Sequence, residues 1–152
     1  MAIDLLPTFA RLAGAELPAQ RIDGLDLWPL FAGEPGARNP HSAYFHYYGR
    51  NELQAVRSGR WKLFFPHESR TVASPPPVAD GRPGKYRALP VATALYDLQA
   101  DLGETTDVAA EHPEIVERLT ALAEQARGDL GDSLAGRTGS GAREPGRWTP
   151  EE

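Results

Sequence analysis

The most constraining feature of the sequence is a pair of alternating segments on either side of a two-residue turn. The segments read ELQAVRS and RWKLFF, and Ser58-Gly59 lies at their junction. Alternation with period 2 is typical of β-strands, and a short turn containing glycine joins two such strands into a hairpin. Val56 and Arg57 then point to opposite faces, as do Leu63 and Lys62. The sequence therefore predicts a β-hairpin at the centre of the chain.

Other segments indicate the rest of this layer. The stretch SAYFHYY, from Ser42 to Tyr48, is aromatic and strand-prone, and TALYDL returns as a strand further on. A helix is expected to begin near Pro113 and to end at Gly131. Its apolar face is formed by Ile115, Val116, Leu119, Leu122, Ala123, Ala126 and Leu130. The pattern predicts an α+β fold, with a small antiparallel sheet of about four strands and one long C-terminal helix.

Glycine and proline divide the chain into many turns. The sequence contains 15 Gly and 14 Pro, and six of the prolines fall in the stretch from Pro66 to Val91. We therefore expect a long loop over 66–91, and loops of that length are often functional. The Gly- and Arg-rich tail, residues 133–152, is expected to be extended or disordered.

The first forty residues follow a different pattern. Apolar residues at helical spacing predict a short helix from about Leu5 to Ala13, with Asp4 as its cap and Gly14 at its C-terminal end. The segment DGLDLWPLFAG predicts a second, very short helix capped by Asp26. Neither helix belongs obviously to the predicted sheet, so residues 1–40 look like the end of another domain.

Composition excludes several kinds of chemistry and partner. The chain has no Cys, which removes disulfides, thiolate catalysis and cysteine-ligated zinc sites. A net charge of −5 disfavours generic nucleic-acid binding. No apolar run approaches the ~20 residues of a membrane span, and the start, MAIDLLPTFARLAG, lacks the basic region of a signal peptide.

No nucleophile stands in a recognisable catalytic frame. None of the six serines lies in a G-x-S-x-G elbow, and no two histidines have H-x-x-x-H spacing. His67 is of interest because it follows a predicted strand end, with Arg70 three residues further on. A histidine beside an arginine can bind or protonate an oxyanion, although both side chains are equally explained as ordinary loop residues.

The acidic segment LYDLQADLGETTD superficially resembles a calcium loop. Its acids, Asp97, Asp101, Glu104 and Asp107, do not have EF-hand spacing. We interpret the segment as structural, with Asp97 closing a strand and Asp101 forming a turn. The sequence thus predicts no metal site.

Three blocks of sequence together resemble the C-terminal portion of sulfatases of the arylsulfatase A-like group. The blocks read DLLPTFARLAGAELP…DGLDLWPLFAG, AVRSGRWKL and LYDLQADLGETTDVAAEHPEIVERL, in the order and spacing of that family. The resemblance runs from Ile3 to about Asp132. It implies that residues 1–40 are the closing helices and loop of an alkaline-phosphatase-like α/β catalytic domain. Residues 41–132 would then form the C-terminal subdomain, and residues 133–152 a tail.

The resemblance also implies where the chemistry of an intact enzyme lies. In that family an upstream catalytic domain supplies the ligands of a calcium ion and a formylglycine, made from the Cys or Ser of a C-x-P-x-R motif. This chain has no such motif and no Asp-Asp or Asp-Asn pair, so we expect no catalytic residue, metal ligand set or cofactor in it. By analogy, His67, Arg70 and Tyr47 are candidate substrate contacts.

Two functions follow as expectations. The chain is either a C-terminal domain or fragment of an arylsulfatase-like sulfuric ester hydrolase, acting on aryl or carbohydrate sulfate esters, or an independent, non-catalytic protein-interaction module. In the first case its partner is the sulfatase catalytic domain, in cis or in trans, and a periplasmic or extracellular parent enzyme is compatible with the family. The first function predicts incomplete burial of Leu5, Leu6, Phe9, Trp28 and Phe31. The second predicts that these side chains are covered.

Overall fold

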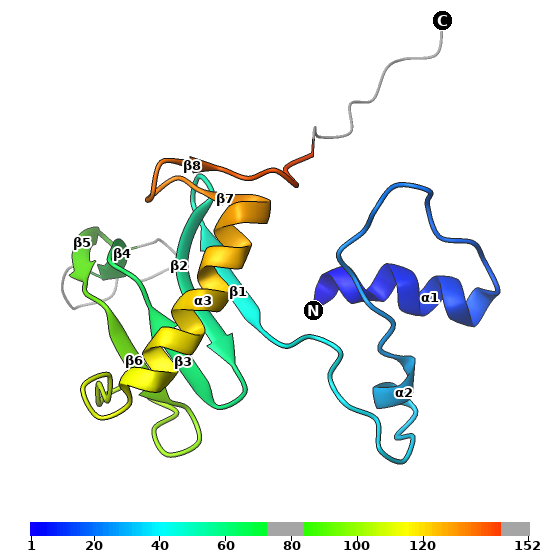
Figure 1. Cartoon of the computed structure of the whole chain (residues 1–152), viewed down its shortest axis with the longest axis horizontal. Helices are drawn as coiled ribbons and strands as arrows, with labels where there is room; N and C mark the ends of the chain where they lie inside the picture. Colours follow the sequence, from blue (N-terminus) through cyan, green and yellow to red (C-terminus); the bar gives the residue numbers. More distant parts are fainter. Residues whose placement is uncertain (73–83, 144–152) are drawn as a thin grey trace, which may run out of the picture. The chain divides into compact units, whose positions relative to one another are not determined.

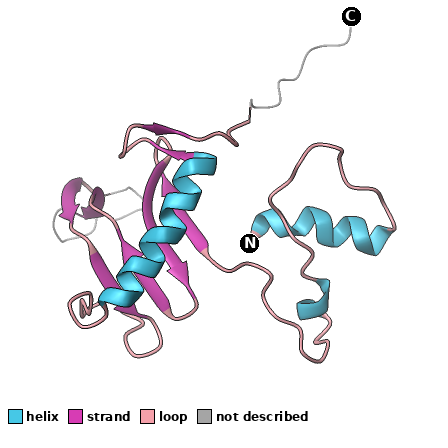
Figure 2. Ribbon diagram, viewed as in Figure 1, coloured by secondary structure: helices cyan, strands magenta, loops and turns pink. Residues whose placement is uncertain are grey.

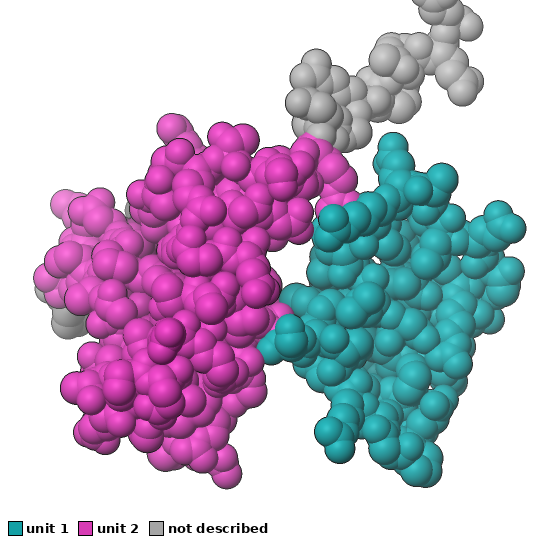
Figure 3. Space-filling model, in the orientation of Figure 1, with its two compact units in different colours: residues 1–42 teal, residues 43–152 magenta. Residues whose placement is uncertain are grey.

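The computed structural model describes residues 1–72 and 84–143. The chain divides into two compact units, residues 1–42 and residues 43–152 (Figure 3). The helices are η1 (Ala2–Asp4), α1 (Leu5–Ala13), α2 (Trp28–Phe31) and α3 (Pro113–Leu130). The strands are β1 (Tyr44–Tyr48), β2 (Glu52–Ser58), β3 (Trp61–Phe64), β4 (His67–Val72), β5 (Tyr86–Val91), β6 (Ala94–Asp97), β7 (Gly131–Asp132) and β8 (Arg137–Thr138).

The first unit contains the two predicted helices and the loop between them (Figure 1). α1 has the predicted bounds and ends at Gly14, whose φ of 63° is left-handed and suits glycine. α2 is a single turn, and the Trp28 N–H donates to Oδ1 of Asp26 at 2.9 Å. Gly24 brings the loop against the start of the first helix, because a Cβ at this position would lie 2.0 Å from the carbonyl oxygen of Ile3.

α1 is held to its own unit by its polar side. The prediction that the Asp4 side chain caps the helix was wrong: Asp4 is fully buried, and its Oδ1 accepts hydrogen bonds from the Leu25 N–H at 2.9 Å and from His41 Nε2 at 2.7 Å. The Thr8 hydroxyl donates to the Asp4 carbonyl at 2.6 Å and accepts from the Leu27 N–H at 2.9 Å. Because these buried polar groups are satisfied, they fix the loop on the helix.

The apolar side of α1 is exposed. Four of its side chains are between 41% and 58% exposed, namely Leu5, Leu6, Phe9 and Leu12. In α2, Phe31 is 61% exposed and Trp28 is partly buried. Leu5, Leu6, Phe9, Trp28 and Phe31 therefore lack full burial in this chain, as the sulfatase resemblance predicted.

The second unit is built on a four-stranded antiparallel sheet with the order β1-β2-β3-β6 (Figure 1). The predicted hairpin is present, with Ser58 opposite Trp61 and Val56 opposite Leu63. This register buries Val56 and Leu63 completely and leaves Arg57 exposed. The predicted α+β fold class is confirmed.

α3 covers one face of this sheet (Figure 2). It begins at Pro113 and ends at Leu130, as the Pro113 and Gly131 signals predicted. The core between helix and sheet contains Leu53, Val56, Leu63, Phe65, Leu95, Leu119, Ala123 and Ala126. Each fully buried leucine contributes roughly 1.5–3 kcal/mol of transfer free energy, so these leucines account for much of the driving force that joins the two layers.

The long loop predicted over 66–91 is instead partly a β-ribbon. β4 and β5 pair antiparallel with each other over their whole length and form a separate two-stranded sheet. The high proline content had led to the prediction of a loop. Pro90 lies opposite Glu68 inside the ribbon, where a missing N–H is tolerated because an isolated ribbon has unpaired edges. The part of the predicted loop at 73–83 lies outside the described residues.

The acidic segment after β6 is structural, as predicted. Oδ2 of Asp101 accepts the N–H groups of Thr105 at 2.6 Å and Thr106 at 2.8 Å. The hydrogen bond from Thr106, followed by those from Thr105, holds the pKa of Asp101 below 3.8. Glu104 adopts a left-handed φ of 53°, and its Oε1 lies 2.7 Å from Nζ of Lys62 in β3.

Part of the tail predicted over 133–152 is folded, because residues 133–143 turn back onto the second unit. β7 pairs with β8, and the following segment returns to α3, where the Ser140 N–H donates to the Gly128 carbonyl at 2.9 Å. The signal that the sequence analysis missed is the turn-forming composition after Gly131. The remainder of the predicted tail, 144–152, lies outside the described residues.

Candidate functional site

A cleft of about 500 Å³ lies between the β4–β5 ribbon and the turn that joins β1 to β2. It is lined by Tyr48, Gly49, Glu52, Glu68, Ser69, Arg70, Tyr86, Arg87, Ala88 and Leu134. A smaller hollow of about 260 Å³ shares four of these residues and adds Gln54. A volume of this size is within the ~300–1,000 Å³ that is typical of small-molecule sites. We call this feature the ribbon cleft.

Arg70, one of the predicted substrate contacts, lies in the ribbon cleft. Its guanidinium carbon is 4.6 Å from the centroid of the Tyr86 ring, a distance that fits a cation–π contact. The N–H donors of a guanidinium lie in its own plane, so stacking on a ring leaves them free for a carboxylate, sulfate or hydroxyl. Arg70 therefore lies against Tyr86, and within residues 1–72 and 84–143 its guanidinium donors have no hydrogen-bond partner.

His67, the second predicted contact, is buried and does not line the cleft. Its Nδ1 lies 2.7 Å from the Phe65 carbonyl, and its ring stacks on Phe64 with centroids 6.0 Å apart. Since side chains alternate along a strand, His67 and Arg70 point to opposite faces of the ribbon. The structure therefore does not bring these two side chains to one site.

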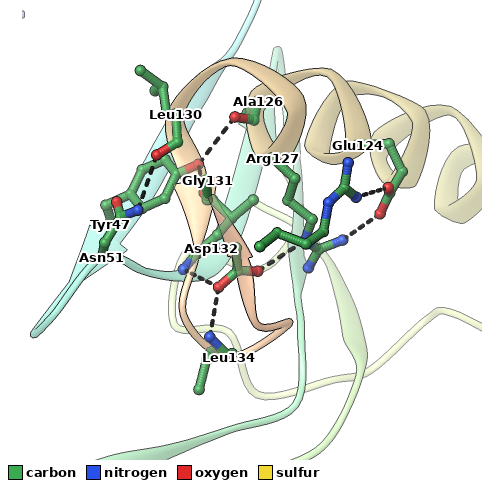
Figure 4. Close-up of polar contacts among 11 residues, drawn as sticks. Tyr47, Asn51, Glu124, Ala126, Arg127, Leu130, Gly131, Asp132 and Leu134 are labelled. Carbon is green, nitrogen blue, oxygen red and sulfur yellow. Dashed lines mark hydrogen bonds and ion pairs between the residues drawn. The ribbon is translucent and has the colours of Figure 1, made fainter. Parts of the chain in front are cut away.

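Tyr47, the third predicted contact, faces the end of α3 (Figure 4). Its hydroxyl donates to the Gly131 carbonyl at 2.9 Å and lies 3.4 Å from the Ala126 carbonyl. Burial, reinforced by the negative charge of Asp132, raises the pKa of Tyr47 above 10.0, so the phenol is neutral at physiological pH. Its neighbour Tyr48, which the sequence analysis did not single out, is the residue that lines the cleft.

Asp132 organises the C-terminal end of α3 (Figure 4). Its side chain is fully buried; Oδ1 accepts the N–H groups of Leu53 at 3.2 Å and Leu134 at 3.0 Å, and Oδ2 accepts from Nε of Arg127 at 2.8 Å. Arg127 also donates to Glu124 at 2.7 Å. Burial disfavours the charge of Arg127, but the hydrogen bonds to Asp132 and Glu124 outweigh this effect and raise the pKa of Arg127.

The same network holds one wall of the ribbon cleft. Asn51, in the turn after β1, donates from Nδ2 to the Leu130 carbonyl at 2.9 Å, and its own carbonyl accepts the Ser133 N–H at 2.9 Å. The turn is thereby tied to the end of α3. Because Tyr48 and Leu134 flank these contacts, their backbones are fixed without a ligand.

Most residues of the cleft could not be found from the sequence. Glu68 and Arg70 share a face of β4, and Tyr86 and Ala88 share the same face of β5 because paired residues lie on one side of a ribbon. The pairing of β4 with β5 cannot be inferred when the segment is interpreted as a loop. The alternation in HESRTV was the one available signal.

The residues of the described chain do not fit the groups that carry out sulfate-ester hydrolysis. The chain contains no Cys and no Ser-x-Pro-x-Arg from which a formylglycine could form. Across residues 1–72 and 84–143 no group of three or more His, Cys, Asp or Glu side chains is arranged to hold a metal ion. In the same ranges, no helix has the length and apolar character needed to cross a bilayer.

Fold and cleft together define an α+β domain that has an open cleft and, among the described residues, no recognisable catalytic set. The family model described as the C-terminal region of aryl-sulfatase matches residues 39–140. The chain therefore belongs to the sulfatase family and corresponds to its C-terminal region.

Individual relatives agree with this assignment. The chain is 37% identical to steryl-sulfatase of Mus musculus over 146 residues, which is 84% of this chain and 22% of the relative. It is 35% identical to arylsulfatase A of Homo sapiens over 133 residues, 80% of this chain and 25% of the relative. The chain thus spans about a quarter of the length of these relatives.

Solved structures also share the fold. One is a sulfatase studied for the metabolism of multiple glycosaminoglycans by Bacteroides thetaiotaomicron, with a TM-score of 0.58 and 25% identity over 82% of this chain and 24% of that one. A 2-O glycosaminoglycan sulfatase has a TM-score of 0.50 at 23% identity, over 82% of this chain and 24% of that one, and supports the fold alone.

Proposed function

We propose that the chain works as the C-terminal domain of an arylsulfatase-like sulfuric ester hydrolase, folded against a catalytic domain in cis. The observation that carries the proposal is the exposed apolar side of α1, whose opposite side is satisfied within the chain. Contiguous exposed apolar surface marks an interaction site. The matched relatives have most of their length outside the region shared with this chain, so the catalytic region is the occupant that we assign.

On this proposal, residues 1–40 close the catalytic domain, residues 41–132 form the C-terminal subdomain and residues 133–152 follow it. The division of the chain into units at residues 42 and 43 supports a boundary near this point. The polar contacts of Asp4 and Thr8 then have a clear role, because they hold α1 with its leucines directed away from its own unit.

The reaction that we propose for the whole enzyme is hydrolysis of an aryl or carbohydrate sulfate ester. Such a reaction needs a strong nucleophile and positive charge around the developing oxyanion. Formylglycine and calcium meet these needs. Both would belong to the catalytic domain, since this chain has no Cys and no Ser-x-Pro-x-Arg and its described residues form no metal-ion set. Of the three candidate contacts, we assign direct contact with substrate to Arg70. His67 and Tyr47 have polar atoms engaged within the chain and position the ribbon and β1.

A chimera tests the proposal. This chain replaces the matching C-terminal region of human arylsulfatase A, and hydrolysis of 4-nitrophenyl sulfate is measured. We expect the chimera to hydrolyse the ester and the isolated chain to be inactive. Phe9→Asp should lower the yield of active chimera at least tenfold, whereas Gln20→Asp, which adds the same charge outside the helix, should not. A folded but inactive chimera, with no effect of Phe9→Asp on its yield, would overturn the proposal.

The alternative function, an independent interaction module, predicted that the apolar side chains of the first unit are covered. Their exposure argues against it. A stable monomer of this chain with no affinity for a sulfatase catalytic region would restore that alternative.

A further inference from the structure

The register of the β4–β5 ribbon decides which charged side chains face the ribbon cleft. Glu68, Arg70 and Tyr86 share one face, because residues two apart on a strand and residues paired across two strands lie on the same side. Arg87 belongs to the opposite face of the ribbon. Glu52 adds a second carboxylate from the start of β2. The charges that face the cleft are thus two negative and one positive.

The charges of opposite sign do not neutralise each other. Glu68 and Arg70 are two residues apart on β4, yet within residues 1–72 and 84–143 neither carboxylate nor guanidinium has a hydrogen-bond or ion-pair partner. The guanidinium lies over the Tyr86 ring, 4.6 Å from its centroid, and its N–H donors lie in its own plane. Both charges are therefore available to a ligand.

Glu52 presents its carboxylate beside an exposed ring. Tyr48, which is 59% exposed, pairs with Glu52 across the β1–β2 turn, so ring and carboxylate lie on the same side. A Cβ on Gly49 would lie 3.2 Å from Oε1 of Glu52, so the glycine leaves room for this carboxylate. Oε2 accepts one hydrogen bond, from Nε2 of Gln54 at 3.0 Å, and further acceptor positions remain on the carboxylate.

This wall of the cleft is set before any ligand arrives. The side-chain amide of Asn51 donates to the Leu130 carbonyl at 2.9 Å, and the Asn51 carbonyl accepts the Ser133 N–H at 2.9 Å. These hydrogen bonds tie the β1–β2 turn to the end of α3. A pre-formed site loses less conformational entropy on binding, which favours affinity from few contacts.

The charges of the cleft are the reverse of those of a basic amino acid. Free arginine or lysine carries two cationic groups and one carboxylate at neutral pH. A guanidinium binds a carboxylate through two parallel, charge-assisted hydrogen bonds, and a tyrosine ring attracts a cation over its face. A simple anion would meet a net negative lining, and a simple cation would leave Arg70 without an acceptor. A ligand with charges of both signs satisfies all three groups.

We propose that the ribbon cleft binds a free basic amino acid, with its carboxylate on Arg70 and its two cationic groups on Glu52 and Glu68. The cleft, of about 500 Å³, has room for one such molecule. The inference goes beyond the proposed function, because it assigns a ligand that is not a sulfate ester and that this domain binds by itself.

The test is a titration of the ¹⁵N-labelled 152-residue chain, followed by amide chemical shifts. The probes are L-arginine, agmatine, which lacks the carboxylate, and Nα-acetyl-L-arginine, which lacks the α-ammonium group. We expect shifts at Tyr48, Glu68 and Arg70. L-Arginine should bind at least about tenfold more tightly than either analogue, because each analogue loses a hydrogen-bonded charge. If the chain self-associates through α1, the Phe9→Asp variant, altered outside the cleft, is titrated in its place.

Matched variants separate the contacts. Arg70→Gln should abolish the preference for L-arginine over agmatine, whereas Arg118→Gln, on the surface of α3, should keep it. Glu68→Gln should weaken L-arginine at least about tenfold, and Glu117→Gln, also on the exposed side of α3, should not. The proposal is overturned if agmatine or Nα-acetyl-L-arginine binds as tightly as L-arginine, if Glu68→Gln binds like the wild type, or if no cleft amide shifts.

The arylsulfatase chimera keeps the two proposals apart, because hydrolysis of 4-nitrophenyl sulfate needs no amino acid. An active chimera with a cleft that binds no L-arginine removes this inference and leaves the proposed function standing. A cleft that binds L-arginine in a chain whose chimera is folded but inactive has the reverse meaning. Since Arg70 is also the residue assigned to the substrate, L-arginine should raise the KM of an active chimera, and binding without this change would overturn the assignment of Arg70 to the substrate.

Discussion

Nζ of Lys62 lies 2.7 Å from Oε1 of Glu104, and this contact joins the third strand of the sheet to the acidic segment after β6. Both side chains are largely buried, at 15% and 27% exposure. Glu104 makes the contact from a left-handed backbone, with φ at 53°, which is a conformation that favours glycine. Glu104 therefore forms its ion pair with Lys62 from a position where its backbone is under strain.

This strain gives an unusual order of stability for substitutions at Glu104. Glu104→Ala loses the ion pair and keeps the strain, whereas Glu104→Gly loses the ion pair and relieves the strain. We expect the glycine variant to be more stable than the alanine variant by about 0.5–1 kcal/mol. Urea denaturation of both variants measures this difference, and an alanine variant equal to or more stable than the glycine variant would contradict the strain at this position.

Removing the Asp132 carboxylate should destabilise the second unit more than any surface substitution. Asp132→Ala leaves the Leu53 and Leu134 N–H groups and the guanidinium of Arg127 without their acceptor. We expect a loss of about 3 kcal/mol of unfolding free energy and faster hydrogen exchange at the Leu53 and Leu134 amides. Glu117→Ala, on the exposed side of α3, is the control and should change stability by less than about 0.5 kcal/mol.

Tyr47→Phe separates a structural role from direct substrate contact. The variant loses the hydrogen bond to the Gly131 carbonyl, so we expect about 1 kcal/mol of destabilisation with unchanged hydrolysis of 4-nitrophenyl sulfate by the arylsulfatase chimera. Since burial raises the pKa of Tyr47 in the folded state, its contribution is complete below pH 10.0 and is lost as the pH rises through the higher folded pKa. Lost hydrolysis with unchanged stability would make Tyr47 a substrate contact instead.

His46 should make stability depend on pH in the mildly acidic range. Burial lowers the pKa of His46 below 6.5, helped by the nearby charges of Lys62 and Arg57 and opposed by Glu104. Below pH 6.5 the unfolded chain therefore binds a proton that the folded chain does not yet bind, so unfolding free energy falls as the pH drops from 6.5 to the lower folded pKa.

The measurement is urea denaturation at about pH 7.5, 6.5 and 5.5 for the wild type and His46→Gln. The other titrating groups are common to both proteins, so the difference between the two profiles isolates His46. We expect the variant to lose less stability on acidification. Parallel profiles would show that His46 does not contribute this proton linkage.

The elements that could be predicted are those encoded by local signals. Pro113 and Gly131 mark both ends of α3, and alternation around Ser58-Gly59 gives the hairpin and its register. The elements that could not be predicted depend on partners far away in the sequence. Asp4 looks like a helix cap within its own segment, and only the fold shows that its side chain accepts hydrogen bonds from Leu25 and His41.

The candidate site likewise contains residues that the sequence predicted and residues that it did not. Arg70 was singled out as a cation near a strand end, and it does line a cleft. Tyr86 and Glu68 join it there only because β4 and β5 pair in one particular register. The proline-rich composition had predicted a loop, so this register could not be inferred. His67 was grouped with Arg70 by distance along the chain, although an odd separation in a strand places them on opposite faces.

The pairing of the ribbon has a consequence for how such a domain can diverge. Among the described strands, β4 and β5 pair only with each other, and the four-stranded sheet is complete without them. Adding or removing a residue pair in the ribbon therefore leaves the register of that sheet unchanged. The same change moves Arg70 and Tyr86 relative to Tyr48. One wall of the ribbon cleft is thus free to vary in length, so that selectivity for a ligand can evolve at little risk to folding.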